Sequence, residues 1–251
     1  MTEVNRLNAL ARRWSKYPGF DYDAGQELLR LPHTVRPFVK DAYLVREGQK
    51  TVECTLLLKG YAFRHKVIRN GGRQIISIHI QTEFVDLQNS LIEIADHNVQ
   101  CLTPCEVVVV PRAALMELAD RSPGVRTAMW IETLLDASIF REWVVNVGRR
   151  DSRTRIAHLL CELAWRLENI GLSEGGIVDF PLTQEQLADA TGLTPVHTNR
   201  TLQSLRREKL IRLDARSLTV LDWDKLREAG DFHELYLHHN GRDVTVQSLA
   251  G

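Results

Sequence analysis

The stretch Leu182–Ile211, LTQEQLADATGLTPVHTNRTLQSLRREKLI, predicts two short helices joined by a tight turn. Thr183 is a candidate N-cap of the first helix, and Gln186 completes a capping-box pattern three residues later. Gly192 ends this helix, because glycine readily adopts the left-handed backbone that a sharp turn requires. Thr194 is the candidate N-cap of the second helix, and the proline after it suits the first helical position. The stretch therefore predicts a helix–turn–helix.

The second helix of this stretch has two different faces. The face that we expect to be buried carries Thr198, Leu202 and Leu205 at helical spacing. The opposite face carries Val196, Asn199, Arg200 and Gln203. A short polar face with one arginine is typical of a recognition helix that reads bases in a DNA major groove. The spacing alone also fits a helix hairpin packed inside another kind of domain.

A basic segment with a hairpin pattern follows the second helix. Leu210–Leu213 and Ser217–Leu221 have the pattern of strands, with Asp214–Arg216 as the turn between them. The basic side chains of this region are Arg206, Arg207, Lys209, Arg212 and Arg216. A basic hairpin after a helix–turn–helix is a wing that can lie on DNA phosphates. A solvated run of charges would not explain the hairpin.

Four motifs of this region resemble the winged helix of the Crp/Fnr family of bacterial transcription regulators, namely Gln184–Ala188, Gly192–Thr194, Asn199-Arg200 and Glu208–Ile211. The resemblance implies that Arg200 donates two hydrogen bonds to a guanine. Val196 stands where the two best-known branches of the family have an acidic residue, so it could pack on a thymine methyl group instead. Asn199 could pair with adenine. We therefore expect Val196, Asn199 and Arg200 to read bases in double-stranded DNA.

Five residues are candidate phosphate contacts. Thr183, Gln184 and Thr194 lie at predicted helix N-termini, where hydroxyls, side-chain amides and backbone N–H groups bind anions. Arg216 lies in the predicted wing. His197 flanks the base-reading face, although an exposed histidine without any DNA contact explains it equally well.

The N-terminal part of the chain is predicted to begin with helices, over residues 1–31, and to continue as a β-roll. Short strand-like runs with turn residues between them are typical of a β-sandwich or β-roll, and they cover residues 43–45, 54–58, 61–69, 74–80 and 107–110. The clearest hairpin turn is Asn70-Gly71-Gly72. This part resembles the cyclic-nucleotide-binding-like roll of the Crp/Fnr family, which is the family's sensor.

A long helix is predicted from Ser122 to about Val147, with two apolar faces. One face carries Ala128, Ile131, Leu135, Ser138 and Glu142, and the other carries Trp130, Leu134, Ala137 and Val144. Both faces must be buried, either inside one domain or, as the resemblance implies, with one face in a homodimer. The overall prediction is an α+β fold in three parts. They are an N-terminal jelly-roll-like β-roll with helices (1–121), a dimerisation helix and hinge (122–149), and a winged helix–turn–helix with a tail (150–251).

The family's contacts to a cyclic nucleotide are not matched by this chain. Nucleotide-binding relatives use a Gly-Glu pair and an Arg followed by Ser or Thr, and alignment places Asp86-Leu87 and Ala95-Asp96 at these positions. Carboxylates repel a phosphate. We therefore expect an effector pocket around Asp86, Ala95 and Asp96 that does not bind cyclic nucleotide, with the effector unknown. An iron–sulfur cluster is not expected either, because Cys54 is the first cysteine.

Composition and the remaining motifs give weaker constraints. The 251 residues have no net charge, no apolar run that could cross a bilayer, and four cysteines that fit a reducing cytoplasm. No glycine loop for phosphates, serine elbow or zinc-protease helix indicates an enzyme, and no cofactor or metal is expected. Two alternatives stay open: a cupin-like metal enzyme using His65, His79 and His97, and a ligand-binding or scaffold protein whose winged helix contacts only protein. RNA polymerase is a candidate partner under the main interpretation.

Overall fold

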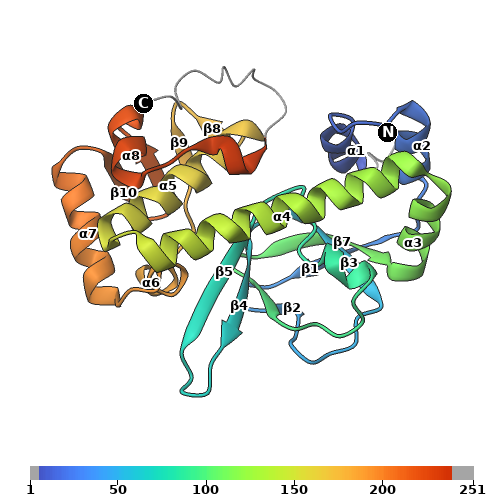
Figure 1. Ribbon diagram of the computed structural model, residues 1–251, viewed down its shortest axis with the longest axis horizontal. Coiled ribbons are helices and arrows are strands. Elements are labelled where there is room, and N and C mark those ends of the chain that lie inside the picture. Colours follow the sequence, from blue (N-terminus) through green and yellow to red (C-terminus); the bar gives the residue numbers. More distant parts are fainter. Residues whose placement is uncertain (1–5, 239–251) are drawn as a thin grey trace.

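The computed structural model describes residues 6–238 of the chain, so the predicted tail beyond residue 240 lies outside the described residues. The longest element is helix α4 (Pro123–Arg149), which runs along the length of the molecule (Figure 1). The N-terminal helices and a β-roll lie along one end of α4, and the C-terminal helices and a small sheet lie along the other (Figure 1). The structure confirms the predicted α+β fold of roll, long helix and winged helix–turn–helix. No helix between residues 6 and 238 combines the length and the apolarity that a bilayer crossing requires.

Two antiparallel sheets form the roll. The first has the strand order β1 (Thr34–Phe38), β7 (Cys105–Pro111), β3 (Glu53–Lys59). The second has the order β2 (Tyr43–Val45), β6 (Asn98–Cys101), β4 (Ala62–Val67), β5 (Arg73–His79). Aliphatic and β-branched side chains favour strands, and the inward ones, such as Leu57, Val99 and Val107, are buried together in the roll.

Helices close the roll at its end. They are α1 (Asn8–Trp14), α2 (Tyr22–Leu29), the short 3₁₀ helix η1 (Leu87–Ser90) and α3 (Arg112–Arg121). Leu10, Trp14 and Leu28 from the first two helices pack with Leu56 of β3 and Val125 of α4 in one apolar cluster. This cluster anchors the first turns of α4 to the roll.

The N-terminal part differs from the sequence prediction in two respects. Strands β1 and β6 were not predicted, and β1 is an edge strand that contains Pro37. The helical pattern of residues 1–31 is divided into two helices by a loop that contains Pro18 and Gly19. Gly19 has φ +76°, a left-handed backbone that glycine adopts readily in the turn between the two helices.

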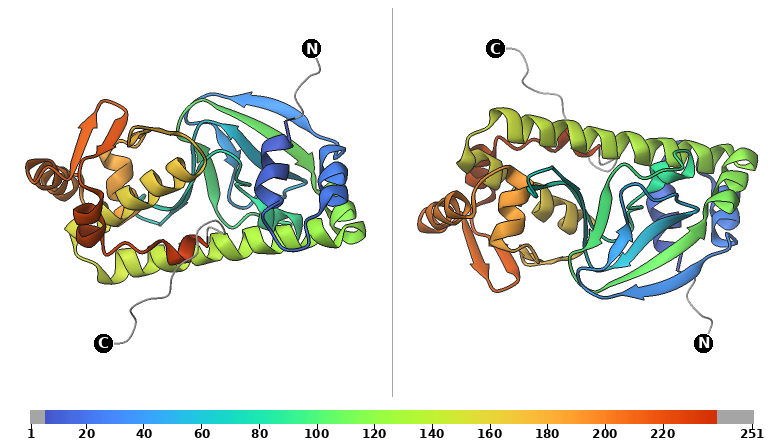
Figure 2. Two further views of the ribbon diagram at one scale, coloured as in Figure 1. Left: turned by 90° about the horizontal axis from the view of Figure 1, so that it is seen from above. Right: turned by 90° about the horizontal axis from the view of Figure 1, so that it is seen from below.

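The C-terminal part packs around an apolar core that it shares with the roll, whose residues Phe63, Ile75 and Ile78 belong to the same buried cluster. Its helices are α5 (Ser152–Asn169), α6 (Gln184–Thr191), α7 (Pro195–Arg207), α8 (Trp223–Gly230) and the 3₁₀ helix η2 (Glu234–Leu237). Its sheet has the order β10 (Ile211–Asp214), β11 (Ser217–Val220), β9 (Ile177–Asp179), β8 (Ser173–Glu174). Leu160, Leu187, Leu202 and Phe232 join these elements in one core. Figure 2 shows η2 lying beside α4, so the chain returns to the long helix after α8.

The two apolar faces of α4 have different surroundings. Ala128 and Ser138 are buried, and Ile131, Leu135 and Glu142 are half-buried, on the face that packs within the chain. On the other face Trp130 is 64% exposed, Leu134 59% and Val144 53%, while Ala137 is half-buried. Large apolar side chains in water are costly, so this second face is a candidate interface.

Candidate nucleic-acid interface

The helix–turn–helix is built by local hydrogen bonds that the sequence predicts. The hydroxyl of Thr183 accepts from the N–H of Gln186 (3.2 Å), and Oε1 of Gln186 accepts from the N–H of Thr183 (2.9 Å). Gly192 closes α6 with φ +64°. The hydroxyl of Thr194 then accepts from the N–H of His197 (3.3 Å) and caps α7. These contacts fix where both helices begin and the angle of the turn between them.

Helix α7 presents the predicted polar face to solvent. Thr198, Leu202 and Leu205 are buried against the domain core, as their spacing predicts. Val196 is 60% exposed, Arg200 is exposed and Asn199 is half-buried. The helix lies at the extreme end of the molecule, where no other element of the described chain covers it (Figure 1). A rigid helix with an uncovered polar face can enter a major groove.

One contact on this face was not predicted. Nδ2 of Asn199 donates a hydrogen bond to Oε1 of Gln184, the first residue of α6 (2.9 Å). The sequence places both residues on exposed surface but gives no signal that they meet, since they are 15 positions apart on different helices. Gln184 therefore has a protein partner in addition to its predicted role as a phosphate contact.

The other candidate phosphate contacts surround the face of α7. Thr183, Thr194 and His197 are exposed at or near helix N-termini, where backbone N–H groups attract anions. Arg216 is exposed on the wing, and its Nη2 lies 3.4 Å from Oδ2 of Asp179 on β9. This ion pair is largely in solvent, so it holds the guanidinium only weakly.

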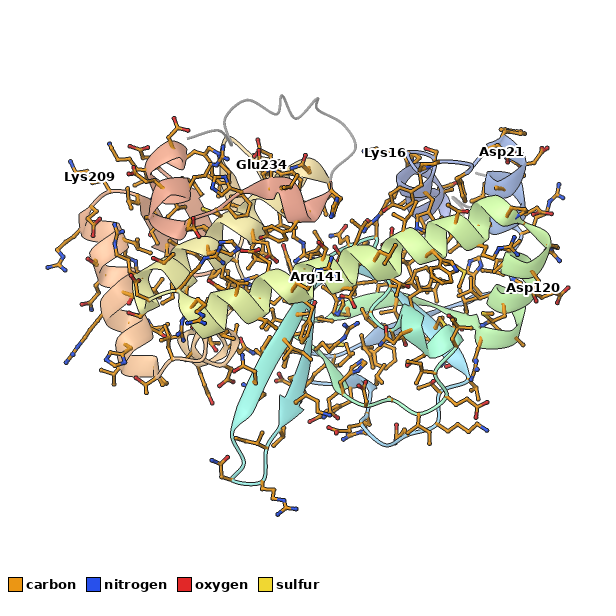
Figure 3. The ribbon with its side chains drawn as sticks, in the orientation of Figure 1. Lys16, Asp21, Asp120, Arg141, Lys209 and Glu234 are labelled. Carbon is orange, nitrogen blue, oxygen red and sulfur yellow. The ribbon has the colours of Figure 1, made fainter. Side chains whose placement is uncertain are left out.

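Further basic side chains form a rim beside these candidate phosphate contacts. Arg206, Arg207, Lys209 and Arg212 are all exposed between the end of α7 and the wing. Lys209 lies at the tip of the molecule on the same side as α7, while Asp21 and Asp120 are at the opposite end (Figure 3). The predicted wing is present as the β10–β11 hairpin, with Ala215 in the left-handed region at φ 49°. The positive charge is therefore concentrated beside the recognition helix although the whole chain has no net charge.

A buried ionic network connects the domain that carries the helix–turn–helix to the roll. Arg166 on α5 contacts Glu83 in the loop after β5 (2.9 Å), Glu162 on α5 (3.0 Å) and the carbonyl of Ile78 (2.9 Å). Burial alone would raise the pKa of Glu83, but the guanidinium of Arg166, then the contact with His79 and the guanidinium of Arg13, hold it well below its usual range. At the roll's hairpin, Nε of Arg73 contacts Asp189 of α6 (2.7 Å). Sequence patterns gave no signal for these long-range pairs.

A cavity of about 110 Å³ lies between the roll, α4 and α5. Among its lining residues are Arg64, His79, Glu83, Leu87, Asp136 and Arg166. Arg64 is held by Asp136 (2.7 Å) and by the carbonyl of Val85 (3.0 Å). Nε of Arg64 and Nε2 of His79 are buried without a hydrogen-bond partner in the part of the chain that the structure describes. The cavity is small, and side chains of opposite charge lie in its walls.

None of the three predicted effector residues lines this cavity. Asp86 is buried and accepts from the N–H of Thr55 (2.6 Å), and burial raises the pKa of its carboxyl to about 7. Ala95 is buried, whereas the side chain of Asp96 is 87% exposed and contacts Nδ1 of His97 (2.6 Å). The effector pocket around these residues stays a prediction.

The three histidines of the roll, His65, His79 and His97, are all buried. Burial lowers the pKa of His65 to about 4, and it also lowers the pKa of His79 and of His97. His79 faces Glu83, and Nε2 of His97 lies 3.1 Å from Nε2 of Gln88. Between residues 6 and 238, no three His, Cys, Asp or Glu side chains are grouped in a way that could hold a metal ion.

Comparisons with known proteins agree with this architecture. Residues 154–229 match the family model of the Crp-like helix–turn–helix domain, and residues 35–122 match that of the cyclic nucleotide-binding domain. The transcriptional activator protein FnrL of Cereibacter sphaeroides is 28% identical over 75% of this chain and 77% of its own. The nitrogen fixation regulation protein FixK of Azorhizobium caulinodans is 22% identical over 76% of each chain.

Solved structures show the same fold. FixK2 from Bradyrhizobium japonicum superimposes with a TM-score of 0.74 at 20% identity, covering 79% of this chain and 98% of that one. A transcriptional regulator of the CRP family from Thermus thermophilus gives a TM-score of 0.63 at 18% identity, covering 78% and 97%. The two family models together cover more than half of the chain, and the geometry of both regions agrees with them. This chain belongs to the Crp/Fnr family of transcription regulators, with a helix–turn–helix DNA-binding domain.

Proposed function

We propose that the protein is a homodimeric regulator that binds a near-palindromic DNA operator, with Val196, Asn199 and Arg200 reading bases. The observation that carries this proposal is the uncovered face of α7, on which Val196 and Arg200 are exposed beside a rim of arginines and lysines. Thr183, Thr194, His197 and Arg216 hold phosphates around this face. Arg200 donates two hydrogen bonds to a guanine, an interaction that discriminates by about 1–3 kcal/mol.

The dimer is formed by the exposed face of α4. Trp130, Leu134 and Val144 recur along this face with large exposed fractions, and Phe140 adds to it. A second copy of the same helix would cover these side chains symmetrically. Two recognition helices would then face successive major grooves, about one helical turn of DNA apart. In this arrangement residues 1–121 form the sensor domain, 122–149 the dimer helix and hinge, and 150–251 the DNA-binding domain.

The roll acts as a sensor domain that does not bind cyclic nucleotide. Asp86 places a buried carboxyl, Ala95 has no charge, and Asp96 adds an exposed carboxylate at the positions that would have to hold the nucleotide. Arg64, a basic side chain that lines the cavity, is engaged by Asp136 of α4. Calorimetric titration with cyclic AMP and cyclic GMP should give no binding heat, and saturable binding of either would contradict this part of the proposal.

The substitution Arg200→Ala tests the base-reading role. It should abolish the preference for the operator while leaving the weaker, salt-dependent binding to random duplex largely intact. The matched control is Arg12→Ala, which removes the same charge from exposed surface on α1, at the other end of the molecule. A gel shift with operator and random duplexes at several salt concentrations measures both effects. An equal loss of affinity for both duplexes in Arg200→Ala would contradict the assignment.

A further inference from the structure

The hydrogen bond between Asn199 and Gln184 bears on which operator sequence the protein prefers. We propose that Gln184 is a positioning residue, which orients the amide of Asn199 to read an adenine. The proposal rests on the proposed DNA-binding function and adds a specificity role to a residue that would otherwise only contact phosphate. Its basis is the hydrogen bond from Nδ2 of Asn199 to Oε1 of Gln184, 2.9 Å long.

The hydrogen-bond inventory of an asparagine explains why this contact suits adenine. The Asn199 amide has one carbonyl oxygen and two N–H groups, and one N–H is taken by Gln184. One N–H donor and one carbonyl acceptor remain. Adenine presents the complementary pair in the major groove, with N7 as acceptor and the N6 amino group as donor. The bond to Gln184 therefore leaves free the two groups that a bidentate contact with adenine requires.

Gln184 is held in place by the start of α6. The capping box of Thr183 and Gln186 fixes this helix terminus, so the first residue of the helix has a defined position. Leu187 of α6 and Leu202 of α7 pack in the same core and hold the two helices together. An amide that is oriented before binding loses less conformational freedom when it meets the base.

The acceptor for the Asn199 amide comes from Gln184 of α6 and not from the α7 face itself. Val196, an exposed residue in the first turn of the helix, has no polar side-chain atom that could orient an amide. Arg200 is a donor only, so it cannot accept the Asn199 N–H. The acceptor comes instead from α6, which means that specificity at this base depends on both helices.

A role in phosphate binding predicts something different for Gln184. Loss of a phosphate contact weakens binding to every sequence about equally and leaves the ranking of operators unchanged. Loss of a positioning contact changes the ranking at one base of each half-site and leaves the other bases alone. Relative affinities for single-base variants of an operator therefore separate the two roles.

The experiment uses full-length protein, an operator selected from random duplexes, and the complete set of its single-base variants. Gln184→Ala should lower the preference for adenine at one position of each half-site by roughly fivefold or more, with no change at the guanine read by Arg200. Gln184→Glu keeps an acceptor for Asn199, so it should retain the adenine preference even if the added negative charge weakens binding overall. In an Asn199→Ala background, Gln184→Ala should have no further effect on base preference. Circular dichroism and thermal melting check that all variants fold like the parent.

Three results would overturn the inference while the proposed function stands. They are a uniform loss of affinity in Gln184→Ala, an equal loss of adenine preference in Gln184→Glu and Gln184→Ala, and a base other than adenine at the position that Asn199→Ala affects. If the parent protein shows no preference among duplexes at any position, guanine included, the proposed function itself fails and this inference fails with it.

Discussion

Arg166 on α5 and Glu83 in the loop after β5 form a buried ion pair, with Nη2 and Oε2 2.9 Å apart. Their side chains are only 7% and 14% exposed. The pair joins the C-terminal half of the chain to the roll, and both residues also line the cavity between the roll, α4 and α5. The pair therefore links the Glu83 loop to helix α5 of the C-terminal half.

Substitution of Arg166 should be strongly destabilising. Arg166→Met removes the guanidinium that pairs with the buried carboxylates of Glu83 and Glu162, and breaking a buried ion pair costs about 3–5 kcal/mol in the free energy of unfolding. The control is Arg212→Met, at an arginine whose pairing with Asp214 is exposed and contributes less than about 1 kcal/mol. Urea unfolding followed by circular dichroism compares the two variants. Equal losses would show that the buried network does not hold the halves together.

Asp86 should make stability fall as pH rises. Its pKa is raised by burial to about 7 in the folded protein, whereas a carboxyl in the unfolded chain titrates near 4. Between these values the folded state binds more protons, so the free energy of unfolding decreases with rising pH, by up to roughly 1.4 kcal/mol per unit. Asp86→Asn can still accept from the N–H of Thr55 but does not titrate. Its stability relative to the parent protein should therefore increase from pH 4 to pH 8.

The control for this pH dependence is Asp96→Asn. Asp96 is an exposed carboxylate whose pKa is lowered, chiefly by its hydrogen bond with His97, so its substitution should produce no such increase. Denaturant titrations at each pH unit give the two difference curves. A flat curve for Asp86→Asn would mean that the carboxyl of Asp86 is already ionised at low pH in the folded protein.

The exposed face of α4 should be required for dimerisation. Leu134→Glu places a charge in the middle of the proposed helix–helix seam, where its burial in a dimer is strongly unfavourable. The control is Val52→Glu, because Val52 is similarly exposed, at 66% against 59% for Leu134, and lies on the roll between β2 and β3. Sedimentation equilibrium should show a monomer for Leu134→Glu and a dimer for the control and the parent. A dimer in all three would assign the interface to another surface.

The wing should contribute affinity without sequence preference. Arg216→Ala removes an exposed guanidinium that is held only by a long contact to Asp179 within the described chain. We expect weaker binding to operator and random duplex alike, with the slope of log affinity against log salt reduced by about one. Fluorescence anisotropy over a range of salt concentrations measures this slope. An unchanged slope would mean that Arg216 does not contact a DNA phosphate.

The sequence predicted best what local chemistry determines. The caps at Thr183 and Thr194 and the turn at Gly192 depend on neighbours within a few residues, and the structure has all of them. The roll was predicted from its apolar runs, but edge strand β1 was not, because an exposed strand with a proline lacks the alternating pattern.

Contacts between distant residues could not be predicted in this way. Arg166 and Glu83 are 83 positions apart, and Asn199 meets Gln184 only because α6 and α7 pack at a particular angle. The charge pattern of α5 marks Arg166 as an ordinary helical arginine, since its burial depends on the roll that docks against it. The cavity also forms by packing between elements that are distant in the sequence. The alignment that selected Asp86, Ala95 and Asp96 therefore did not indicate the residues that line it.

Selection of bound fragments from random duplexes by the parent protein tests the central claim most directly. If two copies of α7 enter successive major grooves, the enriched fragments should contain two inverted half-sites with centres about 10 base pairs apart. Each half-site should contain a guanine whose preference disappears in Arg200→Ala. Absence of enrichment, or enrichment of a single half-site without symmetry, would contradict the account.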